Sequence, residues 1–142
     1  MPEPSQSEPR AHGGVGGWLL VLCRLLIIFH PLSLAITAAN ALGAMAVRGA
    51  PVAMILVLRL FVVSLGVAAG RALQGERPGA VMLAEVALVA SALTDLFVYT
   101  TPYFPNNRPP GDTALYVGAS LAYHALWLGY LMRSKRVRMT FR

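Results

Sequence analysis

Four charged residues and two histidines stand inside long apolar stretches, where a charge is costly and calls for an explanation. They are Arg24, His30, Arg59, Glu85, Asp95 and His124. A charged side chain at the centre of a membrane costs about 2.5–3.5 kcal/mol on insertion scales, so it needs an opposite charge, a hydrogen-bond network or water. An acid and a base can neutralise each other, and a histidine titrates near neutral pH. Two kinds of chemistry follow: ion pairs between helices, and a relay that moves protons or ions.

The apolar stretches that carry these residues have the length of membrane spans. The chain has 142 residues, of which 56% are hydrophobic and 13% charged, and its mean hydropathy is +0.60. Soluble domains are about a quarter charged, and a helix needs about 20 apolar residues to cross a hydrocarbon layer. The stretches are too long for the strands of a membrane β-barrel. We therefore predict an all-α, integral membrane four-helix bundle, residues 18–132, with spans at 18–40, 51–72, 80–101 and 113–132.

The Lys and Arg residues outside the spans, together with Arg71 at the end of the second span, predict the orientation. If both termini are cytoplasmic, eight basic residues lie inside and only Arg48 and Arg108 lie outside. The eight are Arg10, Arg71, Arg77, Arg133, Lys135, Arg136, Arg138 and Arg142. Because cytoplasmic segments carry the excess of Lys and Arg, we predict that both termini are cytoplasmic. Residues 1–17 are predicted to form a disordered N-terminal tail, and residues 133–142 a basic cytoplasmic tail.

Depth along the predicted helices pairs the four charged residues. At 1.5 Å per residue, Arg24 and Glu85 lie roughly 8–10 Å from the cytoplasmic ends of their spans. Arg59 and Asp95 lie roughly 9–12 Å from the opposite ends, within the reach of an arginine side chain. We therefore predict two interhelical ion pairs, Arg24 with Glu85 and Arg59 with Asp95. These pairs either fix the register of the helices or take part in an ion or proton relay.

The two histidines lie near the middle of the first and fourth spans, and His30 is followed by Pro31. Proline removes a backbone donor and bends a helix. A bend beside a histidine gives either a hinge or binding recess, or a kink that neighbouring helices tolerate. His30, Pro31 and His124 are therefore candidate relay or hinge residues.

Small residues recur at helical spacing in two spans. Gly66 and Gly70 form a G-x-x-x-G pattern in the second span. The fourth span has a face of small residues formed by Gly118, Ala122, Ala125 and Gly129. Such faces allow helices to approach closely. We expect them to pack within the chain, and the alternative is contact with a second copy or with another membrane protein.

The basic balance of the chain, a net charge of +6 and an isoelectric point near 10.3, is a signal of topology. In a soluble protein such a balance would indicate nucleic acid. Here the basic residues cluster after the last span, where each contributes about 1 kcal/mol of attraction to anionic headgroups. The predicted headgroup contacts are Arg133, Lys135, Arg136 and Arg138. The expected partner is therefore the lipid bilayer, and no nucleic acid is expected.

The sequence contains none of the motifs typical of enzymes or cofactor sites. There is no G-x-S-x-G, P-loop, Rossmann glycine pattern, H-E-x-x-H or Cys-x-x-Cys. The histidines His12, His30 and His124 lack the spacing of metal ligands, and Cys23 has no second cysteine for a disulfide within the chain. We expect no enzyme activity, no cofactor and no metal. Cleavage of a signal peptide at 39–41 is the less favoured alternative to an intact first span, because the apolar run is longer than a usual signal and contains charge.

Two stretches of the chain resemble a known family. The first is GGWLL at 16–20, and the second is LWLGYL at 126–131, followed by SKRVR at 134–138 and TF at 140–141. Both resemble bacterial membrane proteins grouped as domain-of-unknown-function family 2569. The resemblance implies a small multi-pass protein of the bacterial inner membrane and supplies no activity.

The sequence as a whole favours a structural or accessory role in the bacterial inner (plasma) membrane. The alternative is a small transporter or channel-like protein. In that case Glu85 and Asp95, with His30 or His124, form an intramembrane ion or proton relay.

Overall fold

A computed structural model gives the architecture and describes residues 15–103 and 111–141. All regular secondary structure in these two ranges is helical, which confirms the all-α class. The elements are α1 (Trp18–Arg24), the π-helix η1 (Leu25–Phe29), α2 (His30–Arg48), α3 (Ala50–Gln74), α4 (Ala80–Thr100), α5 (Thr113–Arg133) and α6 (Lys135–Thr140). Most of the N-terminal segment predicted to be disordered lies outside the described residues, as do residues 104–110 between α4 and α5.

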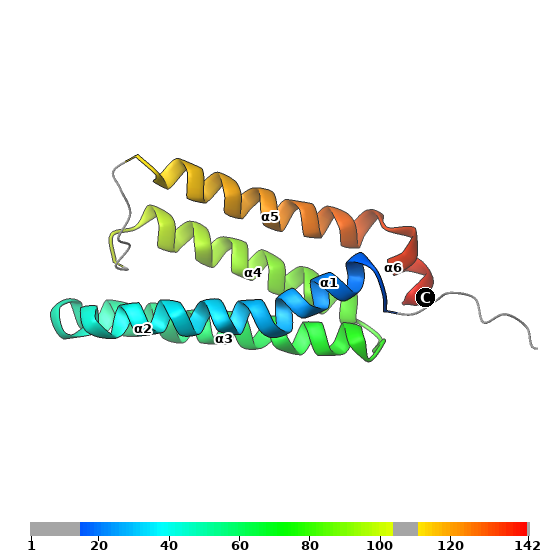
Figure 1. Cartoon of the computed structure of the whole chain (residues 1–142), viewed down its shortest axis with the longest axis horizontal. Coiled ribbons are helices and arrows are strands. Elements are labelled where there is room, and N and C mark those ends of the chain that lie inside the picture. Colours follow the sequence, from blue (N-terminus) through cyan, green and yellow to red (C-terminus); the bar gives the residue numbers. More distant parts are fainter. Residues whose placement is uncertain (1–14, 104–110, 142) are drawn as a thin grey trace, which may run out of the picture.

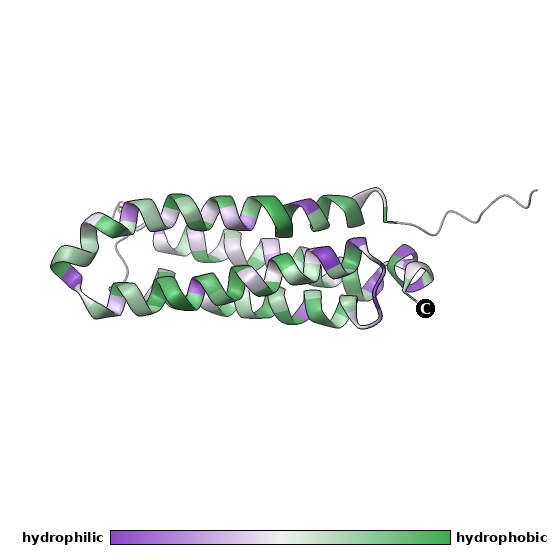
Figure 2. Cartoon of the chain, turned by 90° about the horizontal axis from the view of Figure 1, so that it is seen from below, coloured by the Kyte–Doolittle hydropathy of each residue, from purple (hydrophilic) through white to green (hydrophobic). Residues whose placement is uncertain are grey.

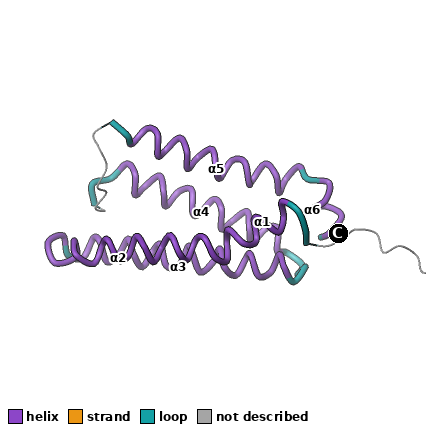
Figure 3. Tube along the Cα trace, in the orientation of Figure 1, coloured by secondary structure: helices purple, strands orange, loops and turns teal. Residues whose placement is uncertain are grey.

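The long helices run back and forth along one axis (Figure 1). α1, η1 and α2 form one continuous bent rod that lies against α3, while α3 packs against α4 and α4 against α5. The α2–α3 turn, the end of α4 and the start of α5 lie at one end, which we call the loop end. α6, the start of α1 and the α3–α4 turn lie at the other, which we call the terminal end. The connections from α2 to α3 and from α3 to α4 are short (Figure 3).

Within residues 15–103 and 111–141, three helical stretches are long and apolar enough to cross a membrane: Trp18–Arg48, Ala50–Gln74 and Ala80–Thr100. α5 has the same 21-residue length as α4 but is less apolar. Its histidine, glycines and tyrosines lower its mean hydropathy. Most residues along the helices are apolar, and hydrophilic residues gather around α6 (Figure 2). The part of the chain that the structure describes therefore has three candidate membrane spans by length and composition.

The first helical stretch is longer than predicted, because it continues past residue 40 to Arg48. Gly43 remains helical, and the helix ends where Gly49 adopts a φ of 64°. A residue with a side chain is strained in this left-handed region, whereas glycine adopts it readily. Pro51 then lies in the first turn of α3, where its missing N–H costs no hydrogen bond.

The C-terminal segment predicted to be a tail contains the short helix α6. Ser134 is its N-cap, and the Ser134 hydroxyl accepts a hydrogen bond of 3.5 Å from the Val137 N–H. Val137 is buried, while Arg136 and Arg138 are exposed. The segment therefore packs the apolar side chains of Val137 and Phe141 against the terminal end and leaves its charges outside.

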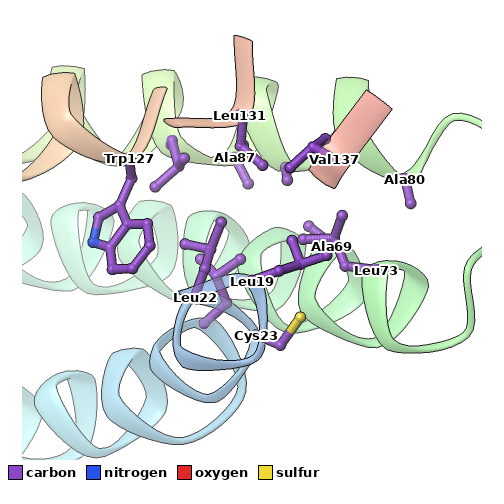
Figure 4. Packing of buried hydrophobic residues seen from close by; sticks show 13 residues of the cluster. Leu19, Leu22, Cys23, Ala69, Leu73, Ala80, Ala87, Trp127, Leu131 and Val137 are labelled. Carbon is purple, nitrogen blue, oxygen red and sulfur yellow. The ribbon is translucent and has the colours of Figure 1, made fainter. Parts of the chain in front are cut away.

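Buried apolar residues form two separate clusters. The terminal-end cluster draws on α1, η1, α3, α4, α5 and α6 and includes Leu19, Leu22, Cys23, Leu73, Trp127, Leu131 and Val137 (Figure 4). The loop-end cluster consists of Ala41, Val52, Ile55 and Val98. These four residues come from α2, α3 and α4, and none comes from α5. α5 therefore contributes buried apolar side chains to a cluster only toward its C-terminal end.

The close approach of α3 to the bent rod depends on Gly70. A Cβ atom built at Gly70 would lie 2.8 Å from Cγ1 of Ile27 and 3.2 Å from the carbonyl oxygen of Cys23. The G-x-x-x-G face of α3 is thus used within the chain. By contrast, no atom of the described residues lies within 4 Å of a Cβ built at Gly118 or Gly129, so the small-residue face of α5 is open.

Candidate functional site: a polar cavity between four helices

A cavity of about 320 Å³ lies between α2, α3, α4 and α5, on the loop-end side of the terminal-end cluster. Most of its lining side chains are polar, and they include His30, Ser33, Arg59, Asp95, Ser120 and His124. Its volume is at the lower end of the range for small-molecule pockets, about 300–1,000 Å³. Among the described residues, no group of three or more His, Cys, Asp or Glu is placed to hold a metal ion. The cavity therefore has the size and polarity of a site for a small molecule.

Arg59 and Asp95 meet on the cavity wall. Arg59 Nη2 donates to Asp95 Oδ1 at 2.9 Å, and the two side chains are 14% and 23% exposed. Arg59 comes from α3 and Asp95 from α4, which are neighbouring antiparallel helices. The structure thus brings together one of the two pairs that depth along the helices predicts.

Ser120 and His124 extend this pair onto α5. The Ser120 hydroxyl donates to Asp95 Oδ2 at 2.9 Å, and His124 Nδ1 lies 2.7 Å from the Ser120 carbonyl oxygen. Since a carbonyl oxygen only accepts, Nδ1 carries a proton, and Nε2 of the neutral ring carries a lone pair. That Nε2 atom is buried and has no hydrogen-bond partner among the described residues. A polar chain therefore runs from α3 through α4 to α5.

His30 reaches the same cavity from the first rod. Its Nε2 atom lies 3.4 Å from the Tyr123 hydroxyl, and the two ring centroids are 6.4 Å apart. The Tyr123 ring also meets His124 edge-on, with 5.0 Å between centroids. Both histidines predicted from the sequence therefore line one cavity, and Tyr123 lies in contact with each.

Pro31 explains how the rod presents His30. Proline has no N–H to donate to the Ile27 carbonyl, so the α-helical hydrogen bond cannot form there. The preceding segment is the π-helix η1, in which the His30 N–H bonds to the Leu25 carbonyl five residues back. Such a wide turn redirects the helix that follows it, and π-turns are frequent at functional sites. Beyond this turn α2 runs along α3 and is not closely packed against α5.

The predicted pair of Arg24 and Glu85 is not formed. Neither residue has an ion pair within the described part of the chain, and neither lines the cavity. The buried face of α1 consists of Leu19, Leu22 and Cys23, and at 100° per residue Arg24 points to the opposite side. Arg24 and Glu85 lie at similar distances from the ends of their helices, but their side chains are on helix faces that do not meet.

Exposed basic residues gather at the terminal end. Arg133, Lys135, Arg136 and Arg138 are exposed there, as are Arg71 and Arg77 at the α3–α4 turn. At the loop end, Arg48 is exposed, and its Nη1 atom donates to the Pro102 carbonyl oxygen at 3.1 Å. The structure thus places the residues of the predicted headgroup contact together on one end.

Sequence reasoning missed the polar residues of α5 that complete the cavity. Tyr116, Ser120 and Tyr123 were not expected to belong to a site, although Ser120 lies four residues before His124. Residues at i and i+4 share a helix face, so this spacing already aligns the serine with the histidine. The sequence therefore already indicated a polar face on this span, formed by Tyr116, Ser120 and His124.

The two stretches that resemble family 2569 meet at the terminal end. The rings of Trp18 and Trp127 are 6.3 Å apart, and Trp127 meets Tyr130 edge-on at 5.9 Å. No family model matches the chain, and comparisons with curated proteins and with solved structures return no match. The assignment to this family therefore stays a prediction.

Proposed function

We propose that the protein crosses the bacterial inner membrane four times, with both termini in the cytoplasm. α5 is as long as α4 and packs along it, and its exposed surface carries Leu115, Leu121, Leu126 and Met132. Large apolar side chains on the outside of a helix are typical of a lipid-facing surface. The basic residues at the terminal end favour the cytoplasmic side for that end. The same residues, on α6 and just before it, bind anionic headgroups in this arrangement.

Within this topology, the protein is a small transporter-like protein that uses the polar cavity to bind a solute and move a proton. The observation that carries this proposal is the linked chain of Arg59, Asp95, Ser120 and His124 on the wall of a cavity inside the bundle. Ionisable residues within membrane spans mark substrate and ion pathways because their burial is costly. Of the two acids that the sequence singled out, only Asp95 lines this cavity.

The structural or accessory role remains the second candidate, and one observation favours it. The small-residue face of α5 has open space at Gly118 and Gly129, and Ala122 and Ala125 on that face are exposed. Faces of this kind pack against other membrane helices. In this alternative the ion pair only fixes the register of α3 against α4.

Proton flux into proteoliposomes tests the proposal. Purified protein is reconstituted with a pH-sensitive dye inside the vesicles, and a pH gradient is imposed. We expect flux with the wild-type protein, loss of flux in Asp95→Asn, and wild-type flux in the matched control Glu85→Gln, whose acid lies outside the cavity. Ser120→Ala keeps both charges and should also lower the flux, which separates loss of the relay from loss of folding.

The outcome that contradicts the transporter proposal is equally defined. If the wild-type protein gives no flux above empty vesicles, while a partner membrane protein co-purifies with it and is lost in Gly118→Leu, the accessory role is correct. If Glu85→Gln abolishes flux as Asp95→Asn does, the relay does not run through the cavity.

A further inference from the structure

The charges on the cavity wall limit the kind of ligand it can hold. Arg59 and Asp95 are the two charged residues that line it, and each neutralises the other at 2.9 Å. The second oxygen of Asp95 accepts from the Ser120 hydroxyl. A cation would have to compete with Arg59 for Asp95, and an anion would have to compete with Asp95 for Arg59. An uncharged ligand leaves this pair intact.

The cavity opens on the side of the bundle between α2 and α5. On its rim, Phe29 and Tyr116 are 55% and 42% exposed, whereas on its floor Thr94 and His124 are 7% and 3% exposed. Phe29 ends η1 just before α2, Tyr116 lies on α5, and α2 and α5 are not closely packed against each other. In a protein that spans the membrane, as proposed above, this side faces lipid. A ligand that enters here passes through hydrocarbon, which strongly disfavours a charged molecule.

The lining suits a molecule with an apolar body and one polar group. Phe29, Tyr116 and Tyr123 supply aromatic surface, with Val62 and Val63 beside them. On the floor, the Nε2 atom of His124 is buried and has no hydrogen-bond partner among the described residues, and in the neutral ring protonated at Nδ1 this atom is an acceptor. A ligand O–H or N–H that reaches the floor gains a hydrogen bond there, and a buried acceptor left without one is unfavourable.

We propose that the cavity binds a small uncharged amphiphile that carries a hydrogen-bond donor, admitted from the bilayer between α2 and α5. The inference rests on the proposed membrane-spanning arrangement and names the ligand class of the proposed transporter. An alcohol, a phenol or a primary amide attached to one ring or to a short chain has the required chemistry. Such a ligand places its apolar body against the aromatic rim and directs its donor toward His124.

Four probes built on one benzyl ring test the ligand class. They are benzyl alcohol, benzyl methyl ether, benzylammonium and benzoate, at pH 7. Each is titrated into the full-length protein in lipid nanodiscs, and the ring ¹⁵N resonances of His124 report binding at the floor. Benzyl alcohol is expected to bind about tenfold more tightly than the ether, because one hydrogen bond to a buried acceptor is worth about one decade in affinity. Benzylammonium and benzoate are expected to bind at least as weakly as the ether, because each carries a charge that must leave water and compete with the ion pair.

Two variants separate the cavity from unspecific partition into lipid. Ser33→Trp fills the rim from α2 and should abolish binding of benzyl alcohol, whereas Ala39→Trp, also exposed on α2 but outside the cavity, should leave it unchanged. His124→Phe keeps a ring on the floor and should make the alcohol and the ether bind alike.

The possible results distinguish the ligand class from the proposed function. Tightest binding of benzoate or benzylammonium, lost in Ser33→Trp, overturns the uncharged ligand but keeps the cavity as a binding site. Equal binding of the alcohol and the ether to the wild-type protein overturns the role of the donor. If no probe distinguishes the wild-type protein from Ser33→Trp, the ligand class is wrong, and the flux assay then decides on the transporter function separately.

Discussion

The two halves of the helical bundle have different interiors although the same long helices build both. Toward the terminal end, the first rod, α3, α4 and α5 converge on an apolar cluster that includes Leu19, Leu73, Trp127 and Leu131. Toward the loop end, α5 takes no part in the buried cluster, and a polar cavity of about 320 Å³ lies between the helices. The half toward the terminal end, here the closed half, provides the packing, and the half toward the loop end, here the open half, leaves room for chemistry.

The residues at each helix contact explain why the halves differ. In the closed half, Gly70 lets the first rod approach α3 so closely that a methyl group would clash. In the open half, the π-turn before Pro31 sends α2 along α3, and α5 is joined there through Ser120 to Asp95. Where polar side chains make the contact, their length keeps the two helices apart. Where glycine makes the contact, the two backbones can approach closely.

The largest expected effect comes from breaking the ion pair of the open half. Asp95→Asn leaves Arg59 without its carboxylate in a largely buried position, and loss of one partner of a buried pair costs about 3–5 kcal/mol. Glu85→Gln removes an acid that has no ion pair in the described residues and should change stability far less. Both variants are measured by SDS-induced unfolding in mixed micelles and by abundance in the membrane.

A charge swap provides the control for this prediction. Arg59→Asp combined with Asp95→Arg restores a pair at the same site and should recover part of the lost stability. Equal destabilisation by Asp95→Asn and Glu85→Gln would contradict the contrast between the paired and the unpaired acid.

One of the two ion pairs predicted from the sequence is present in the structure, and helix geometry explains why the other is not. Depth along a helix follows from residue number, so the match of Arg59 with Asp95 could be predicted. The face that each side chain occupies depends on how the helices pack, and depth alone therefore also paired Arg24 with Glu85, which the structure keeps apart. The local sequence does not determine which face of one helix will contact which neighbouring helix.

The helices were predictable to a similar extent. The all-α class and the starts of α4 and α5 follow from the lengths of the apolar stretches and from the breaks between them. The extension of α2 to Arg48 was missed because Gly43 resembles a helix end, and only Gly49 adopts the backbone conformation that ends the helix. The cavity was missed because four helices supply its walls, and single spans show only isolated polar residues.

The second prediction concerns the closed half. Gly70→Ala places a methyl carbon 2.8 Å from Ile27 Cγ1 and 3.2 Å from the Cys23 carbonyl, so the first rod must move away from α3. Overpacking of this kind costs about 1–3 kcal/mol. Gly118→Ala is the matched control, because its new methyl group meets no atom of the described residues within 4 Å. SDS unfolding of the two variants in the same lipid checks the difference, and similar stabilities would show that the glycine contact does not close this half.

The smallest expected effect comes from the turn that separates the two halves. Pro31→Ala restores an N–H that can bond to the Ile27 carbonyl, and one added backbone hydrogen bond changes stability by about 1 kcal/mol or less. The geometric effect is the informative one. Without the need for a π-turn, α2 should leave the rod at a different angle, and its distance from α5 should change.

Spin labels measure this change and test whether it stays in the open half. One pair, at Ile36 and Leu115, spans α2 and α5, and a second pair, at Val21 and Leu126, spans α1 and α5; all four side chains are exposed. Cys23 is buried, which protects it from the labelling reagent, so it stays in place. Pro31→Ala should shift the distance of the first pair and leave the second unchanged. A shift of both pairs would show that the helices of the two halves move together. The closed and the open half would then differ in the residues that fill them and not in how they move.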